Sequence, residues 1–317
     1  MTDLLTFGET MVSVRTARPM RLGGDAHLSI AGSESNVAIG VARLGHDAAW
    51  LSAVGNDEPG RLIQRTLRAE NVDTTYLRFA DDSFTGFIAF DQPSHDITRV
   101  SYHRRGSAAS TLTASETTAA VESANPTLLH VTGITPALSD TARAATLAAV
   151  RTASAAGVQV SLDVNYRARL WSRADAATAI RELLPHVHTV FSSDDELDLL
   201  TDASDPTADL LKTVDTLVVT AGGKGAWAHT KGTGSASDVH TIHRPALPVT
   251  VVDSIGAGDA FVSGYLSATL DQLPTESRLD RATTSGAFCV TAYGDWESLP
   301  TREDLTLLSH SQGTALR

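Results

Sequence analysis

The chain has one cysteine, few basic residues and no long apolar run, and each absence excludes a class of protein. Cys289 alone cannot form an internal disulfide, and its place in an apolar helical stretch predicts a packed thiol. No run of 18 apolar residues is present, which excludes a membrane-spanning helix. The 25 Lys and Arg residues are outnumbered by 37 Asp and Glu, and the net charge of -12 disfavours nucleic acid as a partner.

The first residues, Met1 to Met11, include Asp3 and Glu9 and contain no basic leader, so we expect a cytoplasmic protein. The composition, with 42% hydrophobic and 20% charged residues, is typical of a globular chain. At 317 residues the chain is long enough for one large α/β domain with an elaboration, or for two small domains.

Short apolar segments alternate with helical patterns along most of the chain. Leu4 to Glu9 predicts a strand, and Val37 to Leu44 predicts a helix that ends at Gly45. Further strands are expected at residues 48–54, 127–131, 158–164, 187–191 and 216–220, and further helices at 60–69 and 140–156. This succession of strands and helices indicates a mostly parallel sheet.

Two regions interrupt this rhythm. Met11 to Ile30 consists of short apolar pieces broken by proline and glycine, which is typical of hairpin strands. Phe84 to Asp91 and Thr98 to His103 predict two more extended segments. We expect these segments to pair as a small β lid, spanning about residues 11–31 and 84–104, within a single domain of residues 1–317.

The stretch from Asp253 to Phe261 combines a strand end, a glycine turn and a helix start. Leu247 to Val252 is mostly apolar and β-branched, which predicts a buried strand, and helical spacing of apolar residues follows from Ala260 onward. Gly256 and Gly258 permit backbone angles that are closed to other residues. The backbone NH groups of residues 256–258 would lie at the first helical turn, where they favour an anion such as phosphate.

Asp259 lies among these anion-binding groups, and two roles for it remain open. Its carboxylate could cap the helix and interact favourably with the helix dipole. It could instead act as a general base that takes the proton of a hydroxyl attacking a phosphoryl group.

Two further segments concentrate polar groups. Residues 101–108 include Tyr102, Arg104 and Arg105, and they form either a solvated edge strand or a grip on an anionic substrate, since Arg binds carboxylates bidentately. Residues 163–171, with Asp163 and Arg167, follow a predicted strand at its carboxyl end, where open α/β sheets bind their ligands.

Taken together, these residues resemble the ribokinase-like (PfkB) carbohydrate kinases over essentially the full length. The resemblance rests on two signatures, Gly32 to Asn36 followed by Ala38, Gly45 and Gly55, and Asp253-x-x-Gly256-Ala257-Gly258-Asp259-x-Phe261. It implies a central, mostly parallel sheet flanked by helices, with a small β-strand lid over a sugar. It also implies that Asp259 is the base and that the NH groups of Gly256, Ala257 and Gly258 stabilise the transferred phosphate.

Within that family the chain is most similar to 2-keto-3-deoxygluconate kinases, through residues 102–108 and the pattern Asp163-x-Asn165-x-Arg167-x-x-Leu170-Trp171. The similarity implies that Tyr102, Arg104 and Arg167 contact the sugar acid, and that Gly32 and Asn36 belong to the same substrate site. Three polar, mostly cationic groups suit a carboxylate better than a neutral hexose.

The resemblance implies ATP and Mg²⁺ as cofactors and leaves a monovalent cation such as K⁺ open. The residues expected at the nucleotide are Ser193, Thr220, Gly222 and Gly225, while Glu196 is expected to act on magnesium through water. The chain departs from the family pattern at Ser193, where the family has Asn, and at Ile255, where it has Thr.

The expected function is ATP-dependent transfer of the γ-phosphate to a terminal hydroxyl of a sugar acid, with 2-keto-3-deoxygluconate as the first candidate. Two alternatives remain open, a kinase for a neutral sugar such as fructose or ribose, and a non-catalytic sugar-binding protein of the same fold. The exposed edge of the lid is a candidate surface for a homo-oligomer, whereas neither nucleic acid nor a membrane is expected as a partner.

Overall fold

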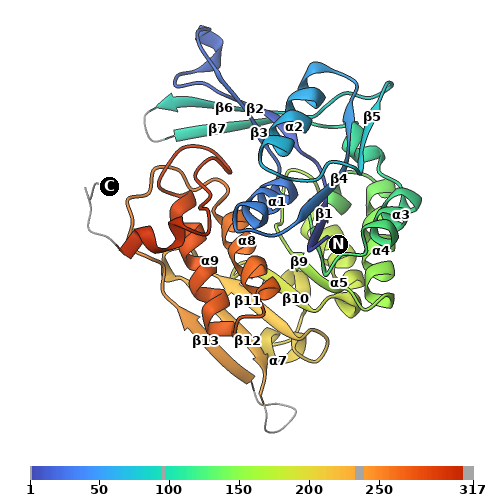
Figure 1. Ribbon diagram of the computed structural model, residues 1–317, viewed down its shortest axis with the longest axis vertical. Helices are drawn as coiled ribbons and strands as arrows, with labels where there is room; N and C mark the ends of the chain where they lie inside the picture. The colour runs from blue at the N-terminus through green and yellow to red at the C-terminus, as the bar shows by residue number, and fades with distance from the viewer. Residues whose placement is uncertain (1, 95–96, 233–238, 310–317) are drawn as a thin grey trace.

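A large sheet runs through the middle of the computed structural model, which describes residues 2–94, 97–232 and 239–309 (Figure 1). In the described residues its strand order is β13-β12-β11-β10-β9-β8-β1-β4-β5. The strands are β1 (Leu4–Phe7), β4 (Ala48–Gly55), β5 (Leu77–Ala80), β8 (Leu128–Thr132), β9 (Gln159–Asp163), β10 (Thr189–Ser193), β11 (Thr216–Thr220), β12 (Ala226–Lys231) and β13 (Val239–Arg244). Neighbouring strands pair in parallel, except that β12 pairs antiparallel with both β11 and β13. The predicted mostly parallel sheet is therefore confirmed.

Helices cover both faces of this sheet, because the central strands are apolar on both sides. One face packs against α3 (Ala114–Ala124), α4 (Asp140–Ala155) and α5 (Arg173–Leu183). The other packs against α1 (Ser33–Arg43), α2 (Glu58–Ala69), α8 (Ala257–Leu270) and α9 (Thr275–Cys289). Short helices α6 (Leu197–Leu200) and α7 (Pro206–Leu210) and six 3-10 turns complete the described chain, the turns being Met20–Leu22, Ala108–Thr111, Thr135–Ala137, Leu184–His186, Gly222–Lys224 and Asp304–Ser309.

A second sheet lies at the top of the molecule in Figure 1, with the strand order β3-β2-β6-β7. Its strands are β2 (Met11–Arg15), β3 (His27–Ala31), β6 (Phe87–Ser94) and β7 (Ile97–His103). We call this sheet the lid. A small apolar cluster that includes Met11, Ala31 and Phe90 faces the main body, and the opposite side is more exposed.

The expected strand at Leu247 to Val252 is wrong. Residues 245–252 form no regular element, and Val251 and Val252 are 64% and 41% exposed. Pro248 lacks the NH group that a ladder needs, so the β-branched residues around it have no strand to join. This segment instead leads along the surface into the turn before α8.

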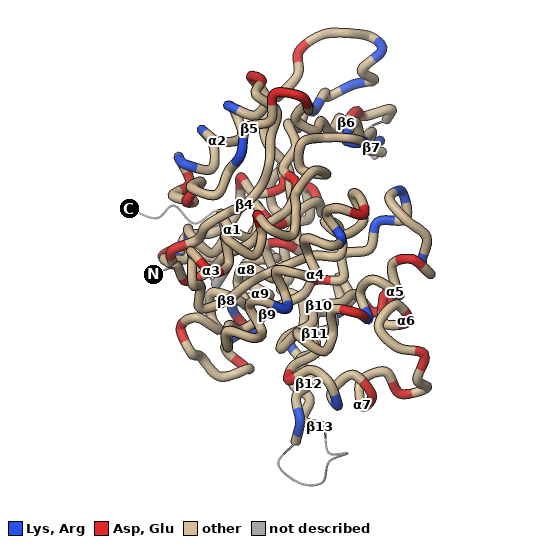
Figure 2. The backbone as a smooth tube through the Cα atoms, turned by 90° about the vertical axis from the view of Figure 1, so that its right-hand side faces the viewer, with Lys and Arg blue, Asp and Glu red and all other residues tan. Residues whose placement is uncertain are grey.

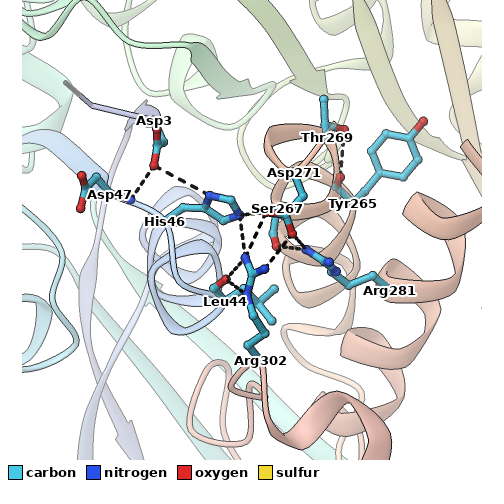
Figure 3. A network of polar contacts seen from close by, with 10 residues as sticks. All are labelled: Asp3, Leu44, His46, Asp47, Tyr265, Ser267, Thr269, Asp271, Arg281 and Arg302. Atoms are coloured by element: carbon cyan, nitrogen blue, oxygen red, sulfur yellow. Dashed lines mark hydrogen bonds and ion pairs between the residues drawn. The ribbon is translucent and has the colours of Figure 1, made fainter. Parts of the chain in front are cut away.

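A polar network joins the segment after α1, the end of α8, α9 and the C-terminal segment (Figure 3). The Asp271 carboxylate, at the end of α8, forms ion pairs with Arg281 at 2.6 Å and with Arg302 at 3.0 Å. Arg302 also donates to the Leu44 carbonyl, at 2.6 and 2.9 Å, after α1. Burial would raise the pKa of Asp271, but the two guanidinium groups outweigh it and the pKa lies below its usual value. The network ties the C-terminal segment to α1 and α8.

Acidic residues outnumber basic ones in the chain, and Figure 2 shows both kinds spread along the backbone. The buried acids include Glu9, Glu34, Asp259 and Asp295, with exposed fractions of 2%, 1%, 8% and 9%. Within the described ranges, none of the helices is both long and apolar enough for a membrane crossing. Buried acids are costly unless they are paired or hydrogen-bonded, so their positions point to a site.

Candidate active site

A cavity of about 470 Å³ is lined both by the lid and by residues at the carboxyl ends of the central strands. Its lining contains most of the residues that the sequence singled out, namely Gly32, Asn36, Tyr102, Arg104, Arg167, Ser193, Glu196, Thr220, Gly256, Gly258 and Asp259. Three expected site residues, Ala257, Gly222 and Gly225, are not part of the lining. Gly225 packs instead against the next segment, where a Cβ would lie 2.0 Å from the Arg244 carbonyl oxygen.

The turn at residues 253–258, which we call the anion-binding turn, leads into α8. Gly256 has φ 78°, and a Cβ there would lie 2.1 Å from the Asp295 carbonyl oxygen, so only glycine fits. A Cβ at Gly258 would meet nothing within 4 Å, which leaves open space beside its backbone. In the described chain the NH groups of Gly256 and Gly258 have no hydrogen-bond acceptor, and they are free to bind an anion.

The Asp259 carboxylate is held by α1 and does not cap α8. One oxygen accepts a hydrogen bond from the Ser33 hydroxyl at 2.6 Å, and the other accepts one from the Asn36 amide at 2.8 Å. Burial raises the pKa of Asp259, while these two hydrogen bonds and the charge of Arg167 lower it. The arrangement orients a carboxylate with raised basicity at the cavity wall, as general-base chemistry requires.

Contacts within the protein fix the first turn of α1 and account for Gly32 and Ser33 without reference to a ligand. A Cβ at Gly32 would lie 2.6 Å from the Glu9 carbonyl oxygen, so glycine is needed for packing. Ser33 also accepts a hydrogen bond from the Asn165 amide at 2.9 Å. We had not expected Ser33 in the site, although it stands beside Gly32 in the N-terminal signature.

Two acids lie at the carboxyl ends of neighbouring strands, Asp163 as the last residue of β9 and Glu196 shortly after β10. Burial and the negative charges of Glu196 and Asp259 raise the pKa of Asp163 well above its usual value. The Glu196 carboxylate accepts backbone hydrogen bonds from Tyr166 at 2.7 Å and Ser193 at 3.0 Å. Both Glu196 oxygens are therefore fixed in direction, and each keeps lone pairs toward the cavity.

Arg104, an expected substrate contact, already has a partner. Its Nε forms a buried ion pair with Glu9, and the Ser107 hydroxyl donates to the other Glu9 oxygen. The Tyr102 ring lies 5.8 Å from the Arg104 guanidinium. Glu9, which ends the first predicted strand, therefore offsets the positive charge of Arg104.

Arg167 differs from Arg104 because it is exposed at the cavity wall. Among the described residues its side chain has no ion pair or hydrogen bond. It lines the same cavity as Asp163 and Asp259, and its positive charge acts to lower the pKa of both carboxyl groups. It is therefore a cation that can accept an anionic group of a ligand.

Two further acids were not expected from the sequence. Burial raises the pKa of Asp295 to about 7, and the charges of Asp259 and Glu297 act in the same direction. Burial also raises the pKa of Glu34, which accepts hydrogen bonds from the Thr132 and Thr135 hydroxyls at 2.6 and 2.7 Å. Asp295 follows no predicted strand, whereas Glu34 stands inside the N-terminal signature between Gly32 and Asn36, which gave it no role of its own.

Asp295 provides a test of this burial. Its pKa of about 7, against 3.8 for an ordinary aspartate, means that ionisation costs stability as pH rises from about 4 to 7. Asp295→Asn is therefore expected to raise the free energy of unfolding at pH 8, by up to about 4 kcal/mol, and to change it little at pH 4. Urea unfolding of both proteins at pH 4, 6 and 8 measures the difference.

The matched control for that comparison is Asp82→Asn, which changes an exposed acid before β6. Its effect on the free energy of unfolding should be small and the same at each pH. If Asp295→Asn changed the free energy of unfolding equally at all three pH values, the raised pKa of the buried Asp295 carboxyl group would be contradicted.

The sequence matches known proteins over its whole length. Residues 1–302 match the model of the pfkB family carbohydrate kinases. A 2-dehydro-3-deoxygalactonokinase of Haloferax volcanii is 35% identical over 302 residues, which cover 92% of each chain. A 2-dehydro-3-deoxygluconokinase of Bacillus subtilis is 35% identical over 323 residues, or 98% of this chain and 97% of the relative. A fructokinase of Klebsiella pneumoniae is 33% identical and covers 86% of this chain and 90% of its own.

The fold is also shared with solved structures. A PfkB protein from a Polaromonas species has a TM-score of 0.82 at 30% identity, covering 97% of this chain and 99% of its own. A putative ribokinase II of E. coli, solved in complex with ATP and Mg²⁺, has a TM-score of 0.88 at 23% identity. The match covers 98% of this chain and 99% of the E. coli chain. The fold and the family match define a phosphotransferase that acts on an alcohol group of a sugar. The chain belongs to the pfkB family of carbohydrate kinases.

Proposed function

We propose that the protein transfers the γ-phosphate of ATP to the terminal hydroxyl of a sugar acid, and that 2-keto-3-deoxygluconate is the substrate. The observation that carries the proposal is Arg167, an unpaired guanidinium at the wall of the cavity that also contains Asp259. A sugar acid fits it through its carboxylate. The names of the Haloferax and Bacillus relatives support the same class of substrate.

Asp259 acts as the base in this proposal. It accepts the proton of the terminal hydroxyl while the hydroxyl oxygen forms its bond to the γ-phosphorus, and the electrons of the breaking phosphorus–oxygen bond leave with ADP. Ser33 and Asn36 hold the carboxylate for this step. The NH groups of Gly256 and Gly258 stabilise the negative charge on the transferred group, whereas the expected NH group of Ala257 already donates to the Ser254 carbonyl oxygen at 3.4 Å.

The residues present also fit a magnesium ion. Each Glu196 oxygen accepts one backbone NH and can still accept a hydrogen bond from a metal-bound water. In the part of the chain that the structure describes, no group of three or more His, Cys, Asp or Glu side chains forms a metal cage. The ion would therefore be held mainly by water and phosphate, where it neutralises phosphate charge.

A monovalent cation fits less well. Such an ion would offset negative charge where acids gather beside the anion-binding turn. The Arg15 guanidinium already lies there, 3.0 Å from the Asp253 carboxylate. The chain thus provides a positive charge of its own at this place. We derive no step through K⁺.

The nucleotide is expected along the carboxyl ends of β10 and β11. Ser193 and Thr220 line the cavity there. The Ser193 hydroxyl donates to Asp195 at 2.6 Å and its backbone NH donates to Glu196 at 3.0 Å, so the lone pairs of the hydroxyl oxygen are what it offers for this role. Gly222 and Gly225 lie in the turn after β11, outside the cavity, and we propose that they border the nucleotide from there.

The experiment is a panel assay of ATP consumption with 2-keto-3-deoxygluconate, 2-keto-3-deoxygalactonate, fructose and ribose. We expect kcat/KM to be at least about 10²-fold higher for a sugar acid than for either neutral sugar, since a cationic site left without its anion loses a charged interaction. Equal kcat/KM for fructose and the sugar acids would support the neutral-sugar kinase instead. No ATP consumption with any sugar would support a non-catalytic sugar-binding protein.

We also propose that two copies can associate through the lid. Both lid edges expose large apolar side chains, with Leu28 on β3 60% exposed and Ile97 on β7 58% exposed. Exposed edge strands pair readily with other strands. Sedimentation velocity measures the assembly, and a monomer at all concentrations would exclude it.

A further inference from the structure

Negative charge gathers around the anion-binding turn, partly at the wall of the substrate cavity, where Asp259 and Asp295 lie. The Cys289 thiol lies under this turn, 3.4 Å from the Ile255 carbonyl oxygen and 3.7 Å from that of Asp295. Burial raises the pKa of Cys289 to about 12, and four acids act in the same direction, namely Asp259, Asp295, Asp253 and Glu297. Uncompensated, these charges would oppose the binding of a phosphate at the turn.

A single arginine reaches this acidic group from the lid. Arg15 is the last residue of β2, and its Nη1 lies 3.0 Å from Asp253 Oδ2, with the two side chains 18% and 11% exposed. The other Asp253 oxygen accepts the backbone NH of Ile255 at 3.1 Å, which closes the start of the turn. Arg15 therefore contacts the residue that shapes the anion-binding turn.

The guanidinium of Arg15 is held by aromatic rings on two sides. It lies 4.5 Å from the centroid of the Phe90 ring on β6 and 6.0 Å from that of Tyr293, in the segment after α9. Its charge lowers the pKa of Asp295, which shows that it acts on the acidic group beyond Asp253. It lines a separate cavity of about 670 Å³ and not the substrate cavity, so it does not touch the reacting groups.

We propose that Arg15 is a positioning residue for phosphoryl transfer. By holding Asp253 it fixes the anion-binding turn, and by its charge it offsets the acids around that turn. This inference rests on the proposed role of the turn in binding the transferred phosphate. Since Arg15 belongs to the lid, it also links the sheet that covers the sugar to the amides that bind the phosphate.

The test compares Arg15→Met with Arg99→Met, both measured with whichever sugar the unmutated protein phosphorylates fastest. Arg99 is a matched control, because it is also a lid arginine with an ion pair, to Asp91 at 2.7 Å, but does not contact the turn. We expect Arg15→Met to lower kcat roughly ten-fold or more and to raise KM for ATP, with KM for the sugar changed less than two-fold. Arg99→Met should leave kcat, KM for ATP and KM for the sugar within about two-fold of the values of the unmutated protein.

Rescue experiments separate positioning from a structural role. Arg15→Lys is expected to recover part of kcat, and guanidinium chloride at low millimolar concentration should increase kcat of Arg15→Ala but not of the unmutated protein or Arg99→Met. Thermal unfolding of each variant is measured alongside. Recovery by both routes supports the proposal.

Two results would overturn it. One is kcat for Arg15→Met within two-fold of Arg99→Met. The other is a loss of activity that follows a lowered Tm and is restored by neither lysine nor guanidinium. Because the reference sugar is chosen by activity, failure of the sugar-acid assignment in the panel assay leaves this comparison intact, and the two failures are distinguishable.

Discussion

Asp259→Asn is expected to lower kcat by about 10²-fold or more while leaving the Kd for ATP nearly unchanged. Asparagine keeps the shape of the side chain and can still hydrogen-bond to Ser33 and Asn36 after an amide flip, but it cannot take a proton. The expected loss is therefore confined to the chemical step. Steady-state kinetics and equilibrium titration with ATP measure the two quantities separately.

The control for this variant is Asp82→Asn, the same chemical change at an exposed acid before β6. It should leave kcat within about two-fold of the unmutated value. If Asp259→Asn retained unmutated kcat on any accepted sugar, Asp259 would not be the base, and its contacts with α1 would be structural only.

The second large effect is expected at Arg167. Removing its guanidinium in Arg167→Ala takes away charged hydrogen bonds to the sugar carboxylate, which are worth about 1.5 to 3 kcal/mol. KM for the sugar acid should therefore rise roughly 10- to 150-fold, while KM for ATP changes little. Initial-rate kinetics with each substrate varied in turn measure both constants.

Arg169→Ala is the matched control, because Arg169 lies on the same segment but outside the cavity and donates to the Val100 carbonyl oxygen at 2.7 Å. Its KM values should stay close to those of the unmutated protein. Equal rises of both KM values in Arg167→Ala would contradict a specific contact with the sugar carboxylate.

Arg104 is a poorer probe than the sequence suggested. Arg104→Ala would also leave the Glu9 carboxylate buried without its ion-pair partner, at 1% side-chain exposure. A rise in KM for the sugar acid would then be mixed with a loss of stability. Sequence alone could not reveal this pairing, because Glu9 and Arg104 come from different segments of the chain.

The fold was predictable because its strands are continuous apolar segments separated by helical patterns, which is how a parallel sheet with two covered faces appears in sequence. The same logic failed at Leu247 to Val252, where β-branched residues favour a strand but Pro248 and the surface path of the chain exclude one. Local propensity was overruled there by the surroundings.

The candidate site was predictable in part. Residues at strand ends and in the glycine turn lie at the cavity, since the topology of a parallel sheet brings those ends together. Partners that pair across the fold were not predictable. The contacts of Asp259 with Ser33 and Asn36, and of Arg15 with Asp253, join residues whose proximity no periodicity encodes.

The most direct measurement is a crystal structure of Asp259→Asn with 2-keto-3-deoxygluconate, magnesium and a non-hydrolysable ATP analogue. We predict the sugar carboxylate at Arg167, the terminal hydroxyl of the sugar within about 3 Å of the side chain at position 259, and the terminal phosphate on the NH groups of Gly256 and Gly258. A terminal hydroxyl turned away from position 259, or a phosphate bound elsewhere, would contradict the account.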